Sequence, residues 1–164
     1  RLLDEALLLC QKGKLHDAAI IYEEVLLAIP LHPQALINLG IIKIQLGNLE
    51  QGIDLLRKAI SVDSSQAYVY MNLGNALIEN GERDEALLMF NKAILIEPNL
   101  ASAHYNLARV IKMEGKYKEA ILSYKKVLSI EPSYAEAYNN LGVIYYEQEK
   151  YDDAIVCFEY YYEK

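Results

Sequence analysis

Apolar residues recur along the chain with the spacing of α-helices. The residues that set this period in one part of the chain are Tyr70, Leu73, Gly74 and Leu77, followed by Ala86, Leu87, Phe90, Ala93 and Ile94. Gly81 lies between the two stretches, where a residue that tolerates left-handed backbone commonly ends a helix. The pattern therefore predicts two helices joined by a tight turn.

This two-helix pattern returns every 34 residues without an insertion. The tripeptide Asn-Leu-Gly or Asn-Leu-Ala begins at Asn38, Asn72, Asn106 and Asn140. Glycine recurs at the same step at Gly13, Gly47, Gly81 and Gly115, and Glu149 replaces it in the last turn. The sequence predicts a single domain of five repeats, residues 1–32, 33–66, 67–100, 101–134 and 135–164. Position 1 of a repeat is residue 33, 67, 101 or 135, and Arg1 stands at position 3.

Three positions in each repeat have a conserved side-chain size from repeat to repeat. Position 8 is small, at Ala6, Gly40, Gly74, Ala108 and Gly142, and position 20 is small, at Ala18, Gly52, Ala86, Ala120 and Ala154. Position 24 is large, at Tyr22, Leu56, Phe90, Tyr124 and Phe158. We expect the small residues to let two helices approach closely and the large residue to fill the space beside them. Pro98 and Pro132 follow the second helix of their repeats and are expected to end it.

The 34-residue unit resembles the tetratricopeptide repeat over the whole chain. The resemblance rests on Leu-Gly at positions 7 and 8, Gly at 15, Ala at 20, Tyr or Phe at 24 and Pro at 32. It implies an all-α fold, an α-solenoid of helix-turn-helix repeats in a right-handed superhelix. In that family the first helix of each repeat lines a concave groove that binds proteins.

The family resemblance also implies which side chains face the groove, at positions 2, 5, 6, 9, 12 and 13. The asparagines at position 6 are Asn38, Asn72, Asn106 and Asn140. The other candidate residues are Leu3, Leu7, Ile37, Ile41 and Ile44 in repeats 1 and 2, Tyr68, Met71 and Asn75 in repeat 3, and Tyr105, Arg109 and Lys112 in repeat 4. This set predicts an extended peptide ligand with apolar residues at one end and an acid toward the other.

The asparagines have two readings that the sequence leaves open. They resemble the asparagine ladder of the O-linked N-acetylglucosamine transferases, in which amide groups would hold a peptide backbone. They could equally bond to the neighbouring helix and set the repeat geometry. A carboxylate clamp of the co-chaperone type is excluded, because Met71, Glu136 and Asn140 stand where that motif has cations.

Composition narrows the classes of function. The chain is 53% apolar with a net charge of −7, which argues against intrinsic disorder and against binding to nucleic acid. The acidic total hides a cationic fourth repeat, since the five repeats carry −2, 0, −3, +3 and −5. The longest uncharged stretch contains Pro30 and Pro33, so no membrane span is expected.

The sequence predicts no catalytic or metal site. Cys10 and Cys157 lie in the first and last repeats, too far apart to form a disulfide, and are compatible with a reducing compartment such as the cytoplasm. The histidines His16, His32 and His104 do not share a helix face, and no phosphate loop or nucleophile elbow occurs. We expect no cofactor and no enzymatic activity from this chain alone.

Two further alternatives concern the ends of the chain. Both ends fall inside a repeat, so we expect a fragment of a longer protein, for instance the substrate-recruiting arm of an enzyme such as a glycosyltransferase. No polar capping helix follows Tyr160, Tyr161 and Tyr162, although solenoid ends normally need one. A homo-oligomer formed through this uncapped repeat is therefore the other alternative.

Overall fold

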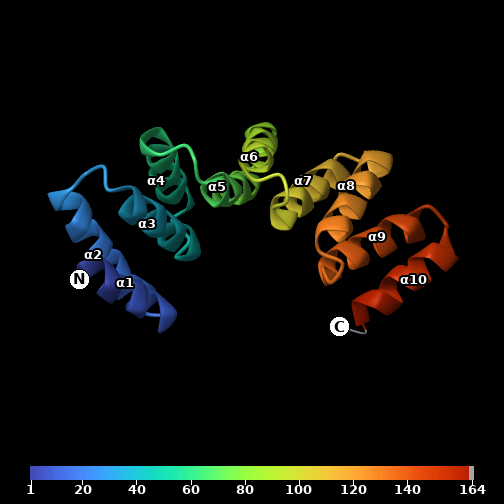
Figure 1. Cartoon of the computed structure of the whole chain (residues 1–164), viewed down its shortest axis with the longest axis horizontal. Coiled ribbons are helices and arrows are strands. Elements are labelled where there is room, and N and C mark those ends of the chain that lie inside the picture. Colours follow the sequence, from blue (N-terminus) through green and yellow to red (C-terminus); the bar gives the residue numbers. More distant parts are fainter. Residues whose placement is uncertain (163–164) are drawn as a thin grey trace. The chain divides into compact units, whose positions relative to one another are not determined.

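The structure is a computed structural model that describes residues 1–162. These residues form ten α-helices and no β-strand (Figure 1). The helices are α1 (Leu2–Gln11), α2 (Leu15–Ala28), α3 (Pro33–Gln45), α4 (Leu49–Val62), α5 (Ala67–Glu79), α6 (Arg83–Ile96), α7 (Ala101–Met113), α8 (Tyr117–Ile130), α9 (Ala135–Glu147) and α10 (Tyr151–Tyr162). The prediction of two helices in each repeat is confirmed.

Each repeat is a pair of helices packed against each other, from α1 with α2 to α9 with α10 (Figure 1). The second helix of a repeat also packs on the first helix of the next, as α2 does on α3, α4 on α5 and α8 on α9. Such contacts between neighbours define an α-solenoid. The helices form two compact units, Arg1–Ile96 (unit 1, α1–α6) and Glu97–Lys164 (unit 2, α7–α10), divided in the linker between repeats 3 and 4.

Small residues at position 8 bring the two helices of a repeat into close contact. A Cβ atom added to Gly74 would lie 2.6 Å from Cε1 of Phe90, and one added to Gly142 would lie 2.6 Å from Cε1 of Phe158. Phe90 is 0% exposed, as are the position 24 tyrosines Tyr22 and Tyr124. The large residue therefore fills the space that the small residue opens, as the sequence predicts.

The turn within each repeat ends the first helix in left-handed backbone. Gly81 has φ +84°, and the glycines that precede and follow it at the 34-residue step have φ between +73° and +83°. The N–H group of Glu82 donates to the carbonyl of Leu77 at 2.8 Å, the six-to-one bond of a Schellman motif. Glu149 adopts the same conformation with φ +60°, although it carries a side chain.

One linker uses a side chain where the others have proline. Residues 63–66 join α4 to α5, and the carboxylate of Asp63 accepts hydrogen bonds from the N–H and the hydroxyl of Ser65 and from the amide of Gln66. These bonds lower the pKa of Asp63 to about 2. The ionised carboxylate organises the linker in place of the missing ring.

Replacing Glu149 by glycine is expected to raise the free energy of unfolding by about 1 kcal/mol, the cost of left-handed backbone for a residue with a Cβ atom. Gly115→Ala is the reciprocal change, and we expect it to lower stability by a similar amount. No atom lies within 4 Å of the added Cβ, so this variant tests the backbone alone. Urea unfolding followed by circular dichroism measures both, and an unchanged midpoint for Glu149→Gly would contradict the account.

Candidate functional site

A cavity of about 230 Å³ opens in unit 1 between α1, α2 and α3. Its lining residues are Leu7, Cys10, Leu15, Tyr22, Asn38, Ile41, Ile42 and Gln45. Most of these side chains are apolar, and the hydroxyl of Tyr22 and the amide of Asn38 supply polar groups. The volume is smaller than the roughly 300–1,000 Å³ of typical small-molecule sites. The cavity, called here the unit 1 pocket, therefore suits one apolar side chain of a larger ligand.

Two of the five apolar groove residues predicted in repeats 1 and 2 lie together with one of the predicted asparagines, and the other three lie elsewhere. Leu7, Asn38 and Ile41 line the unit 1 pocket. Ile37 is only 1% exposed, so the expectation that it forms part of an open floor is wrong for this structure: its side chain belongs to the core. Ile44 is half-buried, close to Gly52 of α4, and Leu3 packs on the core of the first repeat.

Sequence reasoning missed five pocket residues, Cys10, Leu15, Tyr22, Ile42 and Gln45. Cys10 is a free thiol at position 12, one of the groove positions, and its spacing alone gave the signal that could have found it. Burial raises the pKa of the Cys10 thiol, so the group is protonated and weakly nucleophilic at neutral pH. Tyr22 lines the pocket from α2, the second helix of repeat 1, which the groove positions do not include.

The asparagines at position 6 differ in what they bond. Asn38 donates from Nδ2 to the Tyr22 hydroxyl at 2.8 Å and accepts from Gln34 at 2.9 Å. Asn72 is half-buried and donates to the carbonyl of Tyr68 at 2.9 Å. Asn106 is 8% exposed, and its Oδ1 lies 3.5 Å from a guanidinium nitrogen of Arg109.

Asn140 is the most connected of the four asparagines. Its Nδ2 donates to the Tyr105 hydroxyl at 3.0 Å and to the carbonyl of Glu136 at 2.9 Å. Its Oδ1 accepts from the ammonium group of Lys112 at 2.9 Å. Asn38 and Asn140 therefore both bond side chains of the preceding repeat, as a role in repeat geometry requires.

The bonds of Asn38 and Asn140 leave the two buried tyrosines of position 24 in different states. Tyr22 receives the Asn38 amide, whereas the hydroxyl of Tyr124 has no hydrogen-bond partner among residues 1–162. Asn140 stands at the same sequence distance from Tyr124 as Asn38 does from Tyr22, but it donates to Tyr105 instead. Burial raises the pKa of both Tyr22 and Tyr124, so each hydroxyl stays protonated.

Unit 2 places two cations on the first helix of repeat 4. Arg109 is exposed and lies one turn from the half-buried Lys112 on α7. The guanidinium carbon of Arg109 lies 5.9 Å from the centre of the Tyr105 ring, within cation–π range. Burial raises the pKa of Tyr105, and the nearby Arg109 charge opposes that shift.

The predicted groove residues of repeat 3 lie on α5 of unit 1. Tyr68 is 37% exposed, and Met71 and Asn75 are half-buried. Their side chains are thus partly open to a ligand at the surface of unit 1. They do not line the unit 1 pocket.

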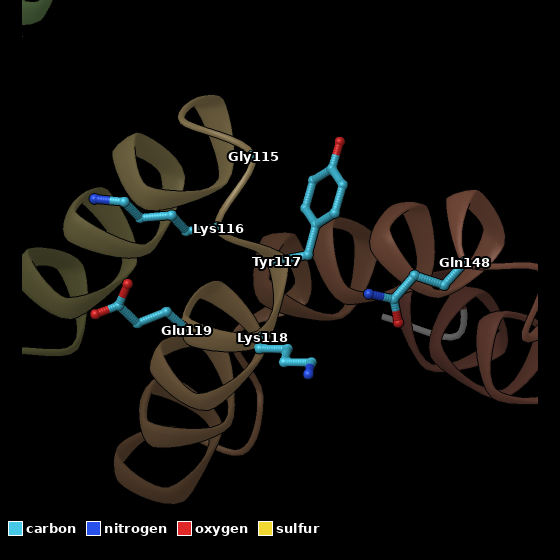
Figure 2. Close-up of a pocket in the computed structure, with 6 residues that line it drawn as sticks. All are labelled: Gly115, Lys116, Tyr117, Lys118, Glu119 and Gln148. Atoms are coloured by element: carbon cyan, nitrogen blue, oxygen red, sulfur yellow. The ribbon is translucent and has the colours of Figure 1, made fainter.

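A wider hollow at the turn between α7 and α8 is a feature of the repeat and not a built site. Its volume is about 440 Å³, and its lining residues are Gly115, Lys116, Tyr117, Lys118, Glu119 and Gln148. Figure 2 shows that these side chains spread in different directions and share no common centre. Similar hollows, of about 330 and 350 Å³, lie at the turns of repeats 2 and 5. The hollow therefore comes from the turn itself.

Models of tetratricopeptide repeats match most of the chain. One described as "TPR repeat" matches residues 40–81 and 112–149, and two described as "Tetratricopeptide repeat" match residues 67–100 and 89–121. The chain belongs to the tetratricopeptide-repeat family. No curated protein sequence matches this TPR chain.

Solved TPR structures share its fold. A crystal structure of MamA is 30% identical, covers 94% of this chain and 91% of its own, and has a TM-score of 0.85. YrrB, described as a TPR protein with an unusual peptide-binding site, is 21% identical over 99% of this chain and 84% of its own, with a TM-score of 0.79. PilF of Pseudomonas aeruginosa is 20% identical over 99% of this chain and 74% of its own length, with a TM-score of 0.90. The last two show the fold alone.

Neither a metal-ion site nor a membrane-spanning helix is found among residues 1–162. Residues 1–162 contain no group of three His, Cys, Asp or Glu side chains placed to hold a metal ion. None of the helices that the structure describes combines the length and apolar character needed to cross a membrane.

The two buried tyrosines give a matched pair of stability variants. Tyr22→Phe is expected to lower the free energy of unfolding by about 1 kcal/mol, because it removes the bond from Asn38. Tyr124→Phe is expected to raise it by about 1 kcal/mol, because it removes a buried hydroxyl without a partner. Urea unfolding of both variants measures the difference, and a Tyr124→Phe protein less stable than Tyr22→Phe would contradict the hydrogen-bond assignment.

Proposed function

We propose that the chain is a non-catalytic scaffold that binds an extended protein segment on the first helices of its repeats. The observation that carries the proposal is the unit 1 pocket, where Leu7, Asn38 and Ile41 surround unfilled space. Empty apolar space at a protein surface is filled favourably by an apolar side chain, at about 25 cal/mol per Å² of area removed from water. A bound segment would therefore anchor here.

Polar groups on the first helices of unit 1 can hold the backbone of the same segment. The Oδ1 atom of Asn72 accepts no hydrogen bond from the residues that the structure describes, while its Nδ2 is bonded to Tyr68. An extended peptide carries unpaired N–H groups, and a half-buried carbonyl oxygen is a suitable acceptor for one. Asn38 contributes differently, since its amide is engaged with Tyr22 and shapes the pocket wall.

The chemistry of the unit 1 pocket favours binding over catalysis. The nucleophilic groups among its lining residues are the Cys10 thiol and the Tyr22 hydroxyl, both protonated, and no histidine or carboxylate lines the pocket to accept a proton from either. The lining offers shape and hydrogen bonds without an acid–base pair. Such a lining is suited to bind an apolar side chain.

The variant Ile41→Lys tests the proposal by placing a charged side chain in the pocket. Decapeptides selected on the wild-type chain from a random phage-displayed library serve as ligands, and fluorescence anisotropy measures their affinity. We expect at least ten-fold weaker binding to Ile41→Lys, because a buried ammonium group replaces apolar contact. Peptides that bind this variant as tightly as the wild type would contradict the proposal, as would a library that yields no binder.

Leu27→Lys is the matched control for this experiment. Leu27 lies on α2, is 84% exposed and does not line the pocket, so the same change of side chain there leaves the cavity intact. Peptide affinity is expected to stay within two-fold of the wild type. Circular dichroism of both variants checks that helicity is unchanged.

Self-association is a second candidate, favoured by one face of α10. Ile155 is 54% exposed on α10, whereas Ile53, at the same position of repeat 2, is 2% exposed where α4 packs on the following helix. A second copy that covers α10 would bury Ile155 in the same way. Tyr161, which replaces Ala or Val at position 27, is half-buried on the same helix.

Sedimentation of the wild type and of Ile155→Lys tests this candidate. We expect an oligomer that dissociates in the variant, because burying the new ammonium group would be costly. A wild-type chain that sediments as a monomer at high concentration would count against it.

A further inference from the structure

Arg109 and Lys112 form a pair of cations on α7 that no carboxylate neutralises. Among residues 1–162 neither side chain lies within 4 Å of an acidic group. Two cations of unit 1 do form such pairs: Lys43 bonds Glu23 at 2.7 Å, and Arg57 bonds Glu85 at 2.9 Å across neighbouring repeats. What distinguishes Arg109 and Lys112 is that they stand one turn apart on α7 and that neutral side chains, not carboxylates, contact them.

Neutral groups hold the two cations in place. The ammonium group of Lys112 donates to Asn140 Oδ1 at 2.9 Å, which uses one of its three donors. The amide of Asn140 is in turn fixed by Tyr105 and by the carbonyl of Glu136. Arg109 lies over the Tyr105 ring and has only a long contact, 3.5 Å, with Asn106. Each cation thus keeps unused donors and is already ordered, which lowers the entropy cost of binding.

We propose that Arg109 and Lys112 bind the carboxylate of an aspartate or glutamate in a partner's extended segment. The inference rests on the proposed function and adds the chemistry of a second anchor, separate from the unit 1 pocket. A guanidinium fork and an ammonium group match the two oxygens of a carboxylate, with charge-assisted hydrogen bonds to both. Lys112 is half-buried, so its share of the interaction is less screened than that of an exposed pair.

The surrounding charge favours a single carboxylate over a polyanion. Glu136 lies on α9 close enough to Tyr105 to oppose ionisation of its hydroxyl, and repeat 5 carries a net charge of −5. A nucleic acid would bring many phosphates against this acidic repeat, whereas one carboxylate brings a single negative charge beside the two cations. The partner is therefore a protein segment with an isolated acidic residue.

Two capped heptapeptides test the proposal on the full chain: acetyl-Ala-Leu-Ala-Asp-Ala-Leu-Ala-amide and its twin with Asn in place of Asp. Titration at low salt, followed by amide chemical shifts in NMR spectra, measures both affinities. We expect the Asp peptide to bind at least five-fold tighter and to shift amides in residues 105–112 and 136–140. The double variant Arg109→Gln/Lys112→Gln is expected to bind the two peptides equally.

The matched control is Lys125→Gln/Lys126→Gln, which removes the same charge from exposed residues on α8. This control variant is expected to keep the preference for the Asp peptide. If the control variant also loses that preference, the effect comes from net charge, and the assignment of the site to Arg109 and Lys112 is wrong. Inorganic phosphate that displaces the Asp peptide at equal concentration would show a general anion site and overturn the carboxylate assignment.

The outcomes separate this inference from the proposed function. If both peptides shift amides around Leu7, Asn38 and Ile41 but bind equally, only the carboxylate site fails. If neither peptide shifts amides in either unit, the proposed function fails with it.

Discussion

The close contact between the two helices of each repeat is the constraint on which the rest of the structure depends. At Gly74 the backbone of α5 lies so near Phe90 that even a Cβ atom would overlap the ring. A contact this tight fixes how the helices cross, because protein interiors are packed at crystal density. To repeat this helix contact every 34 residues, every repeat needs the same spacing between its small and large residues. The sequence accordingly has no insertion between repeats.

The same constraint links position 8 to the asparagines of the next repeat. Repeats with Ala at position 8, at Ala6 and Ala108, have Tyr at position 24, whereas those with Gly have Phe or Leu. The alanine Cβ occupies space that the phenylalanine ring uses elsewhere, so a tyrosine ring cannot lie in the same place. Only a tyrosine offers a hydroxyl to the asparagine that follows, as Tyr22 does to Asn38. The asparagines therefore share a position without sharing a role.

Much of the fold could be predicted from the sequence because its determinants are local and periodic. The helical period, Gly81 in its turn and the pairing of Gly74 with Phe90 each depend on residues within one repeat. The family of the chain follows from the same features.

The candidate site could be predicted only in part, because it depends on competition between neighbours. Ile37 occupies a groove position but is buried, since its exposure depends on what packs around it and not on its place in the repeat. Asn140 could bond Tyr124 or Tyr105, and the choice depends on the geometry of both hydroxyl groups and of Lys112. No sequence period contains this information. Leu7 and Ile41 also occupy groove positions, and in their case the neighbouring side chains leave them open to the unit 1 pocket.

The most direct test of the claim that the first helices bind protein segments is a crystal structure of the chain with a library-selected peptide. The account predicts an apolar side chain in the unit 1 pocket, against Leu7 and Ile41, or an acidic side chain on Arg109 and Lys112. A peptide bound to the outer faces of the second helices, with both places empty, would contradict it.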